Sequence, residues 1–335
     1  MKKEEIKKLF EAFASKKVLV IGDVMIDSYL WGKVERISPE APVPIVNCSK
    51  HESRLGGAGN VALNLIGLGA SPILCGVIGN DDNGTHFLKM MQNNRLNNSG
   101  IYIVKNRPTT IKTRVIGGNQ QLVRIDEETD KPLDGRNESN FIEHINKIVH
   151  KGHIDAIIFQ DYDKGALTAN IIKQITSLAK QKFIPVLVDP KKRNFMNYEN
   201  VDLFKPNFKE LCDGLKMELP KDNFSKIFDS TQEFQKQKKI ELMLITLSDK
   251  GVFVSNNKKF YHLPAHVRDI ADVSGAGDTV ISTACLCLTA GLQLPQIAAI
   301  SNLAGGLVCE NVGVVPIDKK RLEEEMLLLD FSDLN

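Results

Sequence analysis

Short apolar runs that alternate with helical patterns constrain the fold of this chain more than any other feature. Runs of strand length occur at residues 18–23 (VLVIGD), 71–79 (SPILCGVIG), 155–161 (DAIIFQD), 184–190 (IPVLVDP) and 241–248 (ELMLITLS). Helical spacing lies between them, as in residues 60–68, where the pattern stops at Gly69. This alternation predicts an α/β fold with a mostly parallel central sheet and helices on both faces. In such sheets ligands bind beyond the carboxyl ends of the strands.

Two segments break the alternation and predict a second, smaller sheet. Residues 42–50 (PVPIVNCSK) and 101–126, which contain TTIKTRVIGGNQQLVRID, have the pattern of antiparallel strands. The GGN at 117–119 is typical of a hairpin turn. We expect strands near 40–50 and 101–126 to form a small antiparallel β lid that stands off the main sheet. The alternative is that they are edge strands of the main sheet.

Composition and charge argue against several classes of protein. The chain has 335 residues, 42% hydrophobic and 25% charged, with a formal net charge of +2. This balance gives no basis for a nucleic-acid or membrane partner. The first residues, MKKEEIKKLFEAFASKK, predict a short amphipathic helix and no signal peptide, and no run reaches the ~18 apolar residues of a membrane span. Six cysteines without a CxxC pair favour reduced thiols, so we expect a cytoplasmic protein.

The segment DVSGAGDT, residues 272–279, is the strongest candidate for a reactive site. Its small residues precede the apolar helical pattern TVISTACLCLTAGL, and amides at such a helix start bind anions. Asp278 stands where a bound anion would meet a nucleophile, as phosphoryl transfer requires. The residues alone leave two interpretations open, a catalytic base or a helix-capping acid.

A second glycine-rich segment, GGAGN at residues 56–60, is a weaker signal. It lacks the GxGxxG spacing and the lysine of a P-loop, and it follows the polar segment HESRL instead of a buried strand. A tight turn without a ligand explains it as well as a site does. A bare backbone would also suit a polyhydroxylated sugar, to which Asn60 could offer its amide.

Together these two segments resemble the signatures of the ribokinase-like (PfkB) carbohydrate kinases. Longer stretches are similar to the branch of this family that phosphorylates D-glycero-D-manno-heptose 7-phosphate, the kinase half of bacterial ADP-heptose synthesis proteins. These stretches are GDVMIDSYLWG (22–32), RISPEAPVPIV (36–46), GGAGNVALNLIGLGA (56–70), NQQLVRID (119–126), DYDKG (161–165), DPK (189–191) and KPNFKE (205–210). The similarity covers about residues 15–320.

The resemblance implies a ribokinase-like fold and an ATP-dependent kinase. The expected reaction phosphorylates the anomeric hydroxyl of the heptose 7-phosphate and gives heptose 1,7-bisphosphate, a precursor for ADP-heptose and the lipopolysaccharide core. The expected cofactors are ATP and Mg²⁺, with a monovalent cation near the segment before the GAGD motif. The chain contains no HxGH motif, so we expect a single kinase domain over residues 1–335 without a nucleotidyltransferase domain.

The resemblance also implies roles for single residues. Asp278 would deprotonate the acceptor hydroxyl, and Gly275, Ala276 and Gly277 would form the anion hole. Asn207 and Glu210 match the pair that supports Mg²⁺ and the ATP phosphates, with Glu210 nearest the metal. The other expected nucleotide-binding residues are Lys191, Ser248, Gly251 and Asn302. Leu247 departs from the family, since related kinases often carry an arginine there, which removes one expected contact to phosphate.

The expected sugar-phosphate site combines an acid, amides and cations. The residues that we expect to contact the substrate are Asp27, Gly57, Asn60, Lys112, Arg114, Asp161 and Lys164. Lys112 and Arg114 are two apart, so both lie on one face of a predicted lid strand, where they could hold the 7-phosphate. For Arg124, Lys164 and Lys191 a solvated surface charge is an equal alternative. The lid strands offer an edge for pairing, so we expect a homodimer through the lid.

Three other functions remain as alternatives. A sibling kinase of the same fold would act on ribose, fructose or a nucleoside. A sugar-phosphate sensor would keep the fold without catalysis, although the GAGD acid and the NxxE pair are both present. A dinucleotide-dependent oxidoreductase is disfavoured because VLVIGDVM lacks GxGxxG after the first strand.

Overall fold

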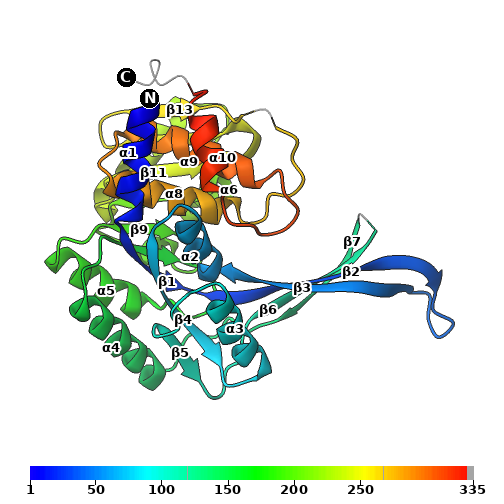
Figure 1. Ribbon diagram of the computed structural model, residues 1–335. Helices are drawn as coiled ribbons and strands as arrows, with labels where there is room; N and C mark the ends of the chain where they lie inside the picture. The colour runs from blue at the N-terminus through cyan, green and yellow to red at the C-terminus, as the bar shows by residue number, and fades with distance from the viewer. Residues whose placement is uncertain (119, 267, 330–335) are drawn as a thin grey trace.

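The computed structural model describes residues 1–118, 120–266 and 268–329, and its centre is a large β-sheet (Figure 1). Among these residues nine strands form this sheet in the order β13-β12-β11-β10-β9-β8-β1-β4-β5. The strands are β1 (Lys17–Gly22), β4 (Ser71–Gly79), β5 (Ile101–Val104), β8 (Ala156–Gln160), β9 (Val186–Asp189), β10 (Leu203–Phe204), β11 (Leu242–Thr246), β12 (Val252–Asn256) and β13 (Phe260–Leu263). Neighbours from β5 to β11 are parallel, and β12 and β13 add an antiparallel edge.

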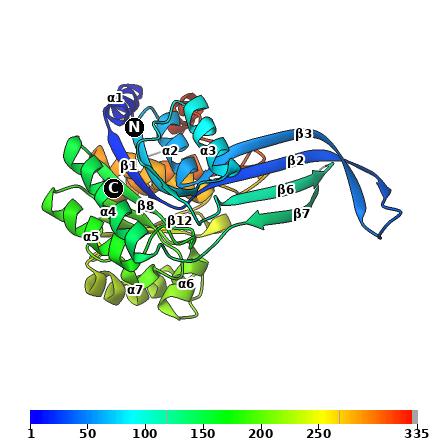
Figure 2. The ribbon, with the colours of Figure 1, turned by 90° about the horizontal axis from the view of Figure 1, so that it is seen from below.

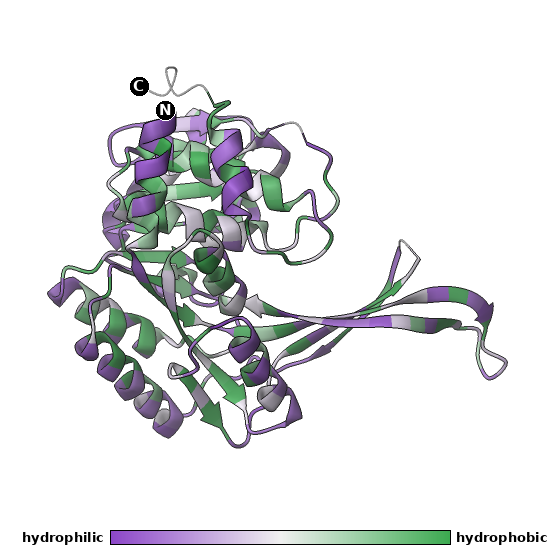
Figure 3. Ribbon diagram, in the orientation of Figure 1, coloured by the Kyte–Doolittle hydropathy of each residue, from purple (hydrophilic) through white to green (hydrophobic). Residues whose placement is uncertain are grey.

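Helices cover both faces of this sheet, as the sequence predicts. Along β1, Val18 and Val20 belong to one apolar core and Leu19 and Ile21 to another, because successive side chains point to opposite faces. The first core includes residues of α1 (Lys3–Ala14), α2 (Ala58–Gly67), α3 (Asp82–Asn93), α8 (Ala276–Thr289), α9 (Leu294–Val308) and α10 (Lys319–Met326). The second includes residues of α4 (Gly135–Lys151), α5 (Ala169–Gln181), α6 (Phe208–Leu215) and α7 (Phe224–Lys238). In Figure 3 the strands of the large sheet are mostly apolar, while α1 and α10 on the outside carry many polar residues.

A second sheet stands away from the body as an arm (Figures 1 and 2). Its strands, in the order β3-β2-β6-β7, are β2 (Val24–Ile37), β3 (Pro44–Gly57), β6 (Ile111–Gly117) and β7 (Gln120–Glu127). The outer pairs are antiparallel and the central pair, β2 with β6, is parallel. The predicted lid therefore exists as a separate sheet, and the alternative of edge strands in the main sheet is wrong for β3, β6 and β7.

Three details of the predicted lid are corrected. Residues 101–104 form β5 at the edge of the large sheet, and the long strand β2 was not predicted. The HESRL segment belongs to β3, so GGAGN does follow a strand. Much of β2 and β3 is exposed on both faces, so polar residues interrupt the alternation that would mark a strand. Asn119 of the predicted GGN turn lies outside the described residues.

The predicted N-terminal helix is confirmed as α1. Among the helices of the described residues, none is both long enough and apolar enough to cross a membrane.

Candidate active site

The candidate site lies where parallel strands of the large sheet end. Asp23 directly follows β1, Gln160 ends β8 and Asp189 ends β9, and these strands are neighbours in the sheet. Their carboxyl ends meet at one edge, which is where α/β sheets bind ligands. Two helix starts face this edge: Asp278 in the first turn of α8 accepts a hydrogen bond from Gln160 at the end of β8, and Asn60 in the first turn of α2 donates to Asp278.

Asp278 is buried and held by side chains from other elements. Asn60 Nδ2 donates to Asp278 Oδ2 at 2.7 Å, while Gln160 Nε2 and the hydroxyl of Tyr162 donate to Asp278 Oδ1 at 3.0 and 2.9 Å. Burial raises the pKa of Asp278 to about 7, with a further rise from Asp189 that the hydrogen bonds partly oppose. These contacts lead away from the helix backbone, so they favour the catalytic interpretation of Asp278 over the capping one.

The start of α8 is shaped for close approach. Gly275 is the N-cap with φ of 81°, and a Cβ there would lie 2.8 Å from Asn60 Nδ2. A Cβ on Gly277 would lie 3.4 Å from Lys205 Nζ and 3.7 Å from Asp189 Oδ2. The small residues Gly275, Ala276 and Gly277 therefore bring the positive end of the helix next to a buried lysine, an arrangement that suits an anion.

A second group of charges lies beside Asp278. Lys205 is buried and pairs with Asp189 at 3.0 Å, and Gln160 Nε2 also donates to Asp189 Oδ2 at 3.2 Å. Lys191 pairs with Glu210, and its Nζ lies 5.4 Å from the centre of the Tyr162 ring. These lysines and the α8 start fit the phosphates of a nucleotide donor.

Asn207 and Glu210 form the N-terminal capping box of α6. Asn207 Oδ1 accepts from the N–H of Glu210 at 2.9 Å, and Glu210 Oε2 accepts from the N–H of Asn207 at 2.8 Å. Within the described residues no cluster of three or more His, Cys, Asp or Glu side chains could hold a metal alone. The oxygen donors Glu210 and Asp189 nevertheless fit Mg²⁺ that shares its shell with phosphate oxygens and water.

The expected nucleotide loop is a short 3₁₀ turn, η2 (Ser248–Lys250), after β11. Ser248 and Gly251 have φ of 55° and 84°, and a Cβ on Gly251 would overlap the carbonyl oxygen of Leu263. Asn207 bridges to Thr246 at the end of β11, so this turn and the start of α6 are neighbours. Asn302 on α9 donates to the carbonyl of Pro264 at 2.8 Å, which fixes the loop after β13.

On the lid side, Asp27 of β2 lies at the base of the arm. It is buried, and Arg114 Nη1 of β6 donates to its Oδ1 at 2.6 Å. Gly56 packs so closely that a Cβ would overlap Asp27 Oδ2. Gly57 has φ of 59°, and a Cβ on it would overlap the carbonyl oxygen of Asp23. The GGAGN glycines thus bring β3 against the carboxylate of Asp27 and the backbone of Asp23.

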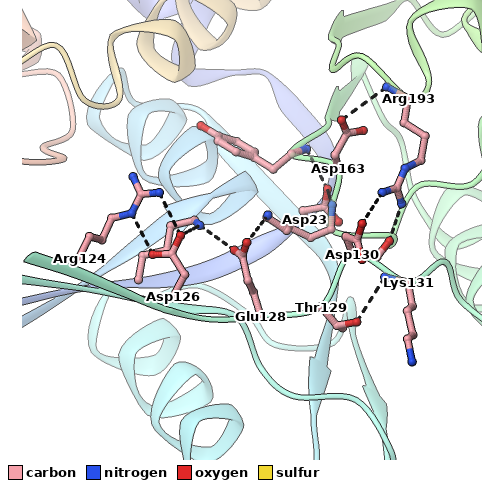
Figure 4. A network of polar contacts seen from close by, with 12 residues as sticks. Asp23, Arg124, Asp126, Glu128, Thr129, Asp130, Lys131, Asp163 and Arg193 are labelled. Carbon is pink, nitrogen blue, oxygen red and sulfur yellow. Dashed lines mark hydrogen bonds and ion pairs between the residues drawn. The ribbon is translucent and has the colours of Figure 1, made fainter.

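The expected phosphate cations lie on the same face of β6 but have different partners. Arg114 pairs with Asp27, whereas Lys112 pairs with Asp126 at 3.0 Å and with Glu128 at 2.6 Å. Lys164 also pairs with Glu128, at 2.5 Å, and Figure 4 shows Glu128 within this network. Lys112 and Lys164 are brought together, and neither is a freely solvated surface charge.

Asp161, which we expected to contact the substrate, is hydrogen-bonded to other parts of the protein. Its Oδ2 accepts from Asn194 Nδ2 and from the hydroxyl of Tyr198, both at 2.9 Å, and its Oδ1 accepts from the N–H of Asp163. Burial, followed by the nearby Asp23 carboxylate, raises the pKa of Asp161 to about 7. The carboxylate points into the second core, so its contacts do not support the predicted role in substrate binding.

Four residues of the site were missed by sequence reasoning: Asp23, Gln160, Tyr162 and Lys205. Asp23 accepts from the N–H groups of Tyr162, Lys164 and Ala166 at 2.8 to 3.1 Å, and so fixes the loop after β8. Gln160 closes the otherwise apolar strand AIIFQ, and Lys205 opens KPNFKE at a buried strand end. A polar residue at the end of an apolar strand was the available signal.

Comparison with known proteins identifies the family of this chain. The profile of the pfkB family carbohydrate kinases matches residues 15–320. The bifunctional protein HldE of Helicobacter acinonychis (strain Sheeba) is 39% identical over 315 residues, which are 94% of this chain and 66% of that protein. The chain thus spans slightly less than two thirds of that relative.

Solved structures show the same fold. Phosphofructokinase-2 from Escherichia coli in complex with potassium superposes with a TM-score of 0.76 at 18% identity, over 94% of this chain and 99% of that one. Arabidopsis thaliana ribokinase complexed with ribose and ATP gives a TM-score of 0.70 at 16% identity, over 94% and 99%. The ribokinase-like fold is therefore confirmed. Together with the family match, it shows that this chain belongs to the pfkB family and is a carbohydrate kinase.

Proposed function

We propose that this kinase transfers the γ-phosphoryl group of Mg·ATP to the anomeric hydroxyl of D-glycero-D-manno-heptose 7-phosphate. The product would be heptose 1,7-bisphosphate, a precursor for ADP-heptose. The observation that carries the proposal is the buried Asp278 beside the α8 start and the Lys191 and Lys205 side chains. The choice of sugar is supported by the HldE relative and by the cations near Asp27.

In this mechanism Asp278 accepts the proton of the attacking hydroxyl. A pKa near 7 keeps the carboxylate basic enough to take that proton and ionised enough to be ready near neutral pH. Asn60, Gln160 and Tyr162 hold its oxygens in place. The α8 amides, Lys191 and Lys205 stabilise the charge that develops on the transferred phosphoryl group.

Metal ions complete the part of the site that binds ATP, the phosphoryl donor. Mg²⁺ supplies charge neutralisation of the phosphates, and Glu210 and Asp189 are the residues that would hold its water shell. We also propose a monovalent cation near the segment before the GAGD motif, which the potassium complex of phosphofructokinase-2 supports. Turnover in potassium chloride compared with choline chloride tests this cation.

We further propose that both sheets act as one kinase domain over residues 1–335 and that two copies associate through the lid. Exposed apolar side chains on the lid support the association, among them Val123 and Ile125 with 49% and 50% exposure.

A coupled ADP-release assay with Mg·ATP tests the function. It compares heptose 7-phosphate, ribose, fructose and fructose 6-phosphate for the wild type, for Asp278→Asn and for Glu143→Gln, an exposed acid on α4. We expect turnover on the heptose phosphate alone, lost by about 10³-fold in Asp278→Asn and unchanged in Glu143→Gln. Turnover on another sugar would keep the kinase and discard the heptose. Binding without turnover on any sugar would favour the sensor.

A further inference from the structure

Glu128, just beyond β7, connects two lysines from different parts of the chain. Its Oε2 lies 2.6 Å from Lys112 Nζ and its Oε1 lies 2.5 Å from Lys164 Nζ. The three side chains are only 13% to 23% exposed. Figure 4 shows Glu128 at the centre of this network, with Asp126 and Arg124 to one side and Asp130 with Arg193 to the other.

The two lysines are tied to the reacting end of the site. The register of β2 with β6 sets Lys112 beside Asp27. The N–H groups of Lys164 and Tyr162 both donate to Asp23 Oδ2, at 3.1 and 2.8 Å, and the Tyr162 hydroxyl contacts Asp278. The loop that Asp23 anchors thus holds Tyr162 against Asp278, the proposed base, and Lys164 against Glu128. A ligand that reaches from Asp278 to Glu128 would contact both Tyr162 and Lys164.

Two ammonium groups held this close need an anion between them. Partial burial raises the pKa of Glu128, but hydrogen bonds from Lys112 and Lys164 bring it below the usual value. A phosphate monoester carries about −1.5 to −2 charge near neutral pH and three acceptor oxygens, against one charge and two oxygens for a carboxylate. The same lysines would therefore bind a phosphate more strongly than a carboxylate, once the carboxylate withdraws.

We propose that Glu128 is a specificity-determining residue that occupies the place of the substrate's phosphate group and yields Lys112 and Lys164 to a dianionic phosphate. The proposal rests on the proposed function, in which the acceptor is a sugar phosphate. In the free protein Glu128 keeps the two lysines in position for the ligand. A ligand must displace this carboxylate before it can bind the two lysines. A singly charged group therefore gains little binding free energy from the exchange, and a dianion gains more.

Titration calorimetry with inorganic phosphate tests the proposal, in the presence of a saturating non-hydrolysable ATP analogue. Glu128→Gln keeps the shape of the side chain and removes its charge, so its affinity for phosphate should rise about tenfold, equivalent to ~1.4 kcal/mol. The matched control is Asp130→Asn, whose carboxylate pairs with Arg193 and is 69% exposed. This control should bind phosphate as the wild type does.

A double-mutant cycle with Lys112→Met shows whether the gain in phosphate affinity depends on Lys112. The gain from Glu128→Gln should vanish when Lys112 is absent, and Lys112→Met and Lys164→Met should each weaken phosphate binding. Equal or weaker binding in Glu128→Gln would overturn the proposal, as would a gain that survives Lys112→Met. If Glu128→Gln does not fold, unchanged binding in both lysine variants overturns it.

This experiment separates the two proposals because it needs no turnover. Tighter phosphate binding through Lys112, with no activity on heptose 7-phosphate, would retain the role of Glu128 and discard the substrate. Activity on heptose 7-phosphate with no gain in Glu128→Gln would retain the substrate and discard the role of Glu128.

Discussion

The hydroxyl of Tyr162 donates to Asp278 Oδ1 at 2.9 Å, while the N–H of the same tyrosine donates to Asp23 Oδ2 at 2.8 Å. Burial, and then the nearby carboxylates Asp278 and Asp189, raise the pKa of Tyr162 well above its usual value, so the phenol remains a donor. Asp23 fixes the loop and Tyr162 transmits this position to Asp278. The tyrosine is therefore a positioning residue for the proposed base.

Tyr162→Phe should move the pH dependence of the reaction. The tyrosine hydrogen bond lowers the pKa of Asp278, so its loss should raise that pKa further above about 7. The acid limb of kcat/KM should shift to higher pH, with lower activity near neutral pH that recovers in alkaline buffer. Tyr102→Phe is the control, because the Tyr102 hydroxyl contacts Asn137 and Asn140 on α4. A uniform loss at every pH would mean that Tyr162 only supports the fold.

Asp278 should also couple stability to pH. Its folded pKa of about 7 exceeds the reference value of 3.8, so its contribution to stability is fully present below the unfolded pKa and is lost as pH rises through about 7. The effect is on the order of 1.4 kcal/mol for each pH unit between the two values. Asp278→Asn removes this titration. The Tm of the variant minus that of the wild type should therefore increase from about pH 5 to about pH 7 and level off above that pH.

Differential scanning fluorimetry across this range checks the coupling. Glu143→Gln serves as the control, because a hydrogen bond from Lys147 holds the pKa of Glu143 below its usual value and outside this window. Its Tm difference from the wild type should be constant. A constant difference for Asp278→Asn as well would show that Asp278 has an ordinary pKa.

Gly56→Ala should separate Asp27 from Arg114. A Cβ at residue 56 would overlap Asp27 Oδ2 and lie 2.9 Å from Met25 Cγ, so the carboxylate has to move away from its 2.6 Å contact with Arg114. We expect KM for the sugar substrate to rise about tenfold or more, given ~1.5–3 kcal/mol for a charge-assisted hydrogen bond. Steady-state kinetics with varied sugar measures it.

The control for this substitution is Gly135→Ala at the start of α4, where a Cβ meets open space. It should leave KM unchanged. An unchanged KM in Gly56→Ala would show that Asp27 does not contact the sugar.

Ile125→Glu should disrupt the proposed association through the lid. Ile125 pairs with Thr113 and is half exposed, on the face of the lid opposite to Lys112 and Arg114. A charge there should convert dimers to monomers in light scattering at equal protein concentration. Ile103→Glu, on an equally exposed residue of β5, should leave the mass unchanged. A monomeric wild type across a wide concentration range would reject the dimer.

Much of the fold could be predicted from local pattern. The apolar runs at β1, β4, β8, β9 and β11 were recognised because a parallel strand buried on both faces needs a nearly continuous apolar sequence. The lid was harder to predict. Strands β2 and β3 run far from the body, so their burial does not alternate regularly along the sequence.

The candidate site was likewise predictable from the sequence only in part. The GGAGN and GAGD segments identified Asn60 and Asp278, which the fold joins by a hydrogen bond across 218 positions of the chain. Within DYDKG, however, the sequence favoured Asp161 over Tyr162. Side-chain directions in that loop depend on its backbone, where Asp163 has φ of 56° and Asp23 accepts three N–H groups from the loop.

By itself the sequence determined the α/β class and the acid at the start of α8, because burial periodicity and glycine-rich turns are local properties of a chain. The family followed from the resemblance of its motifs to those of known kinases. Only the tertiary structure decided which polar groups meet. It turned Asp161 into the core, set Tyr162 on Asp278 and paired both Lys112 and Lys164 with Glu128. Such contacts depend on the direction of side chains from separate strands and loops, and local sequence does not encode that direction.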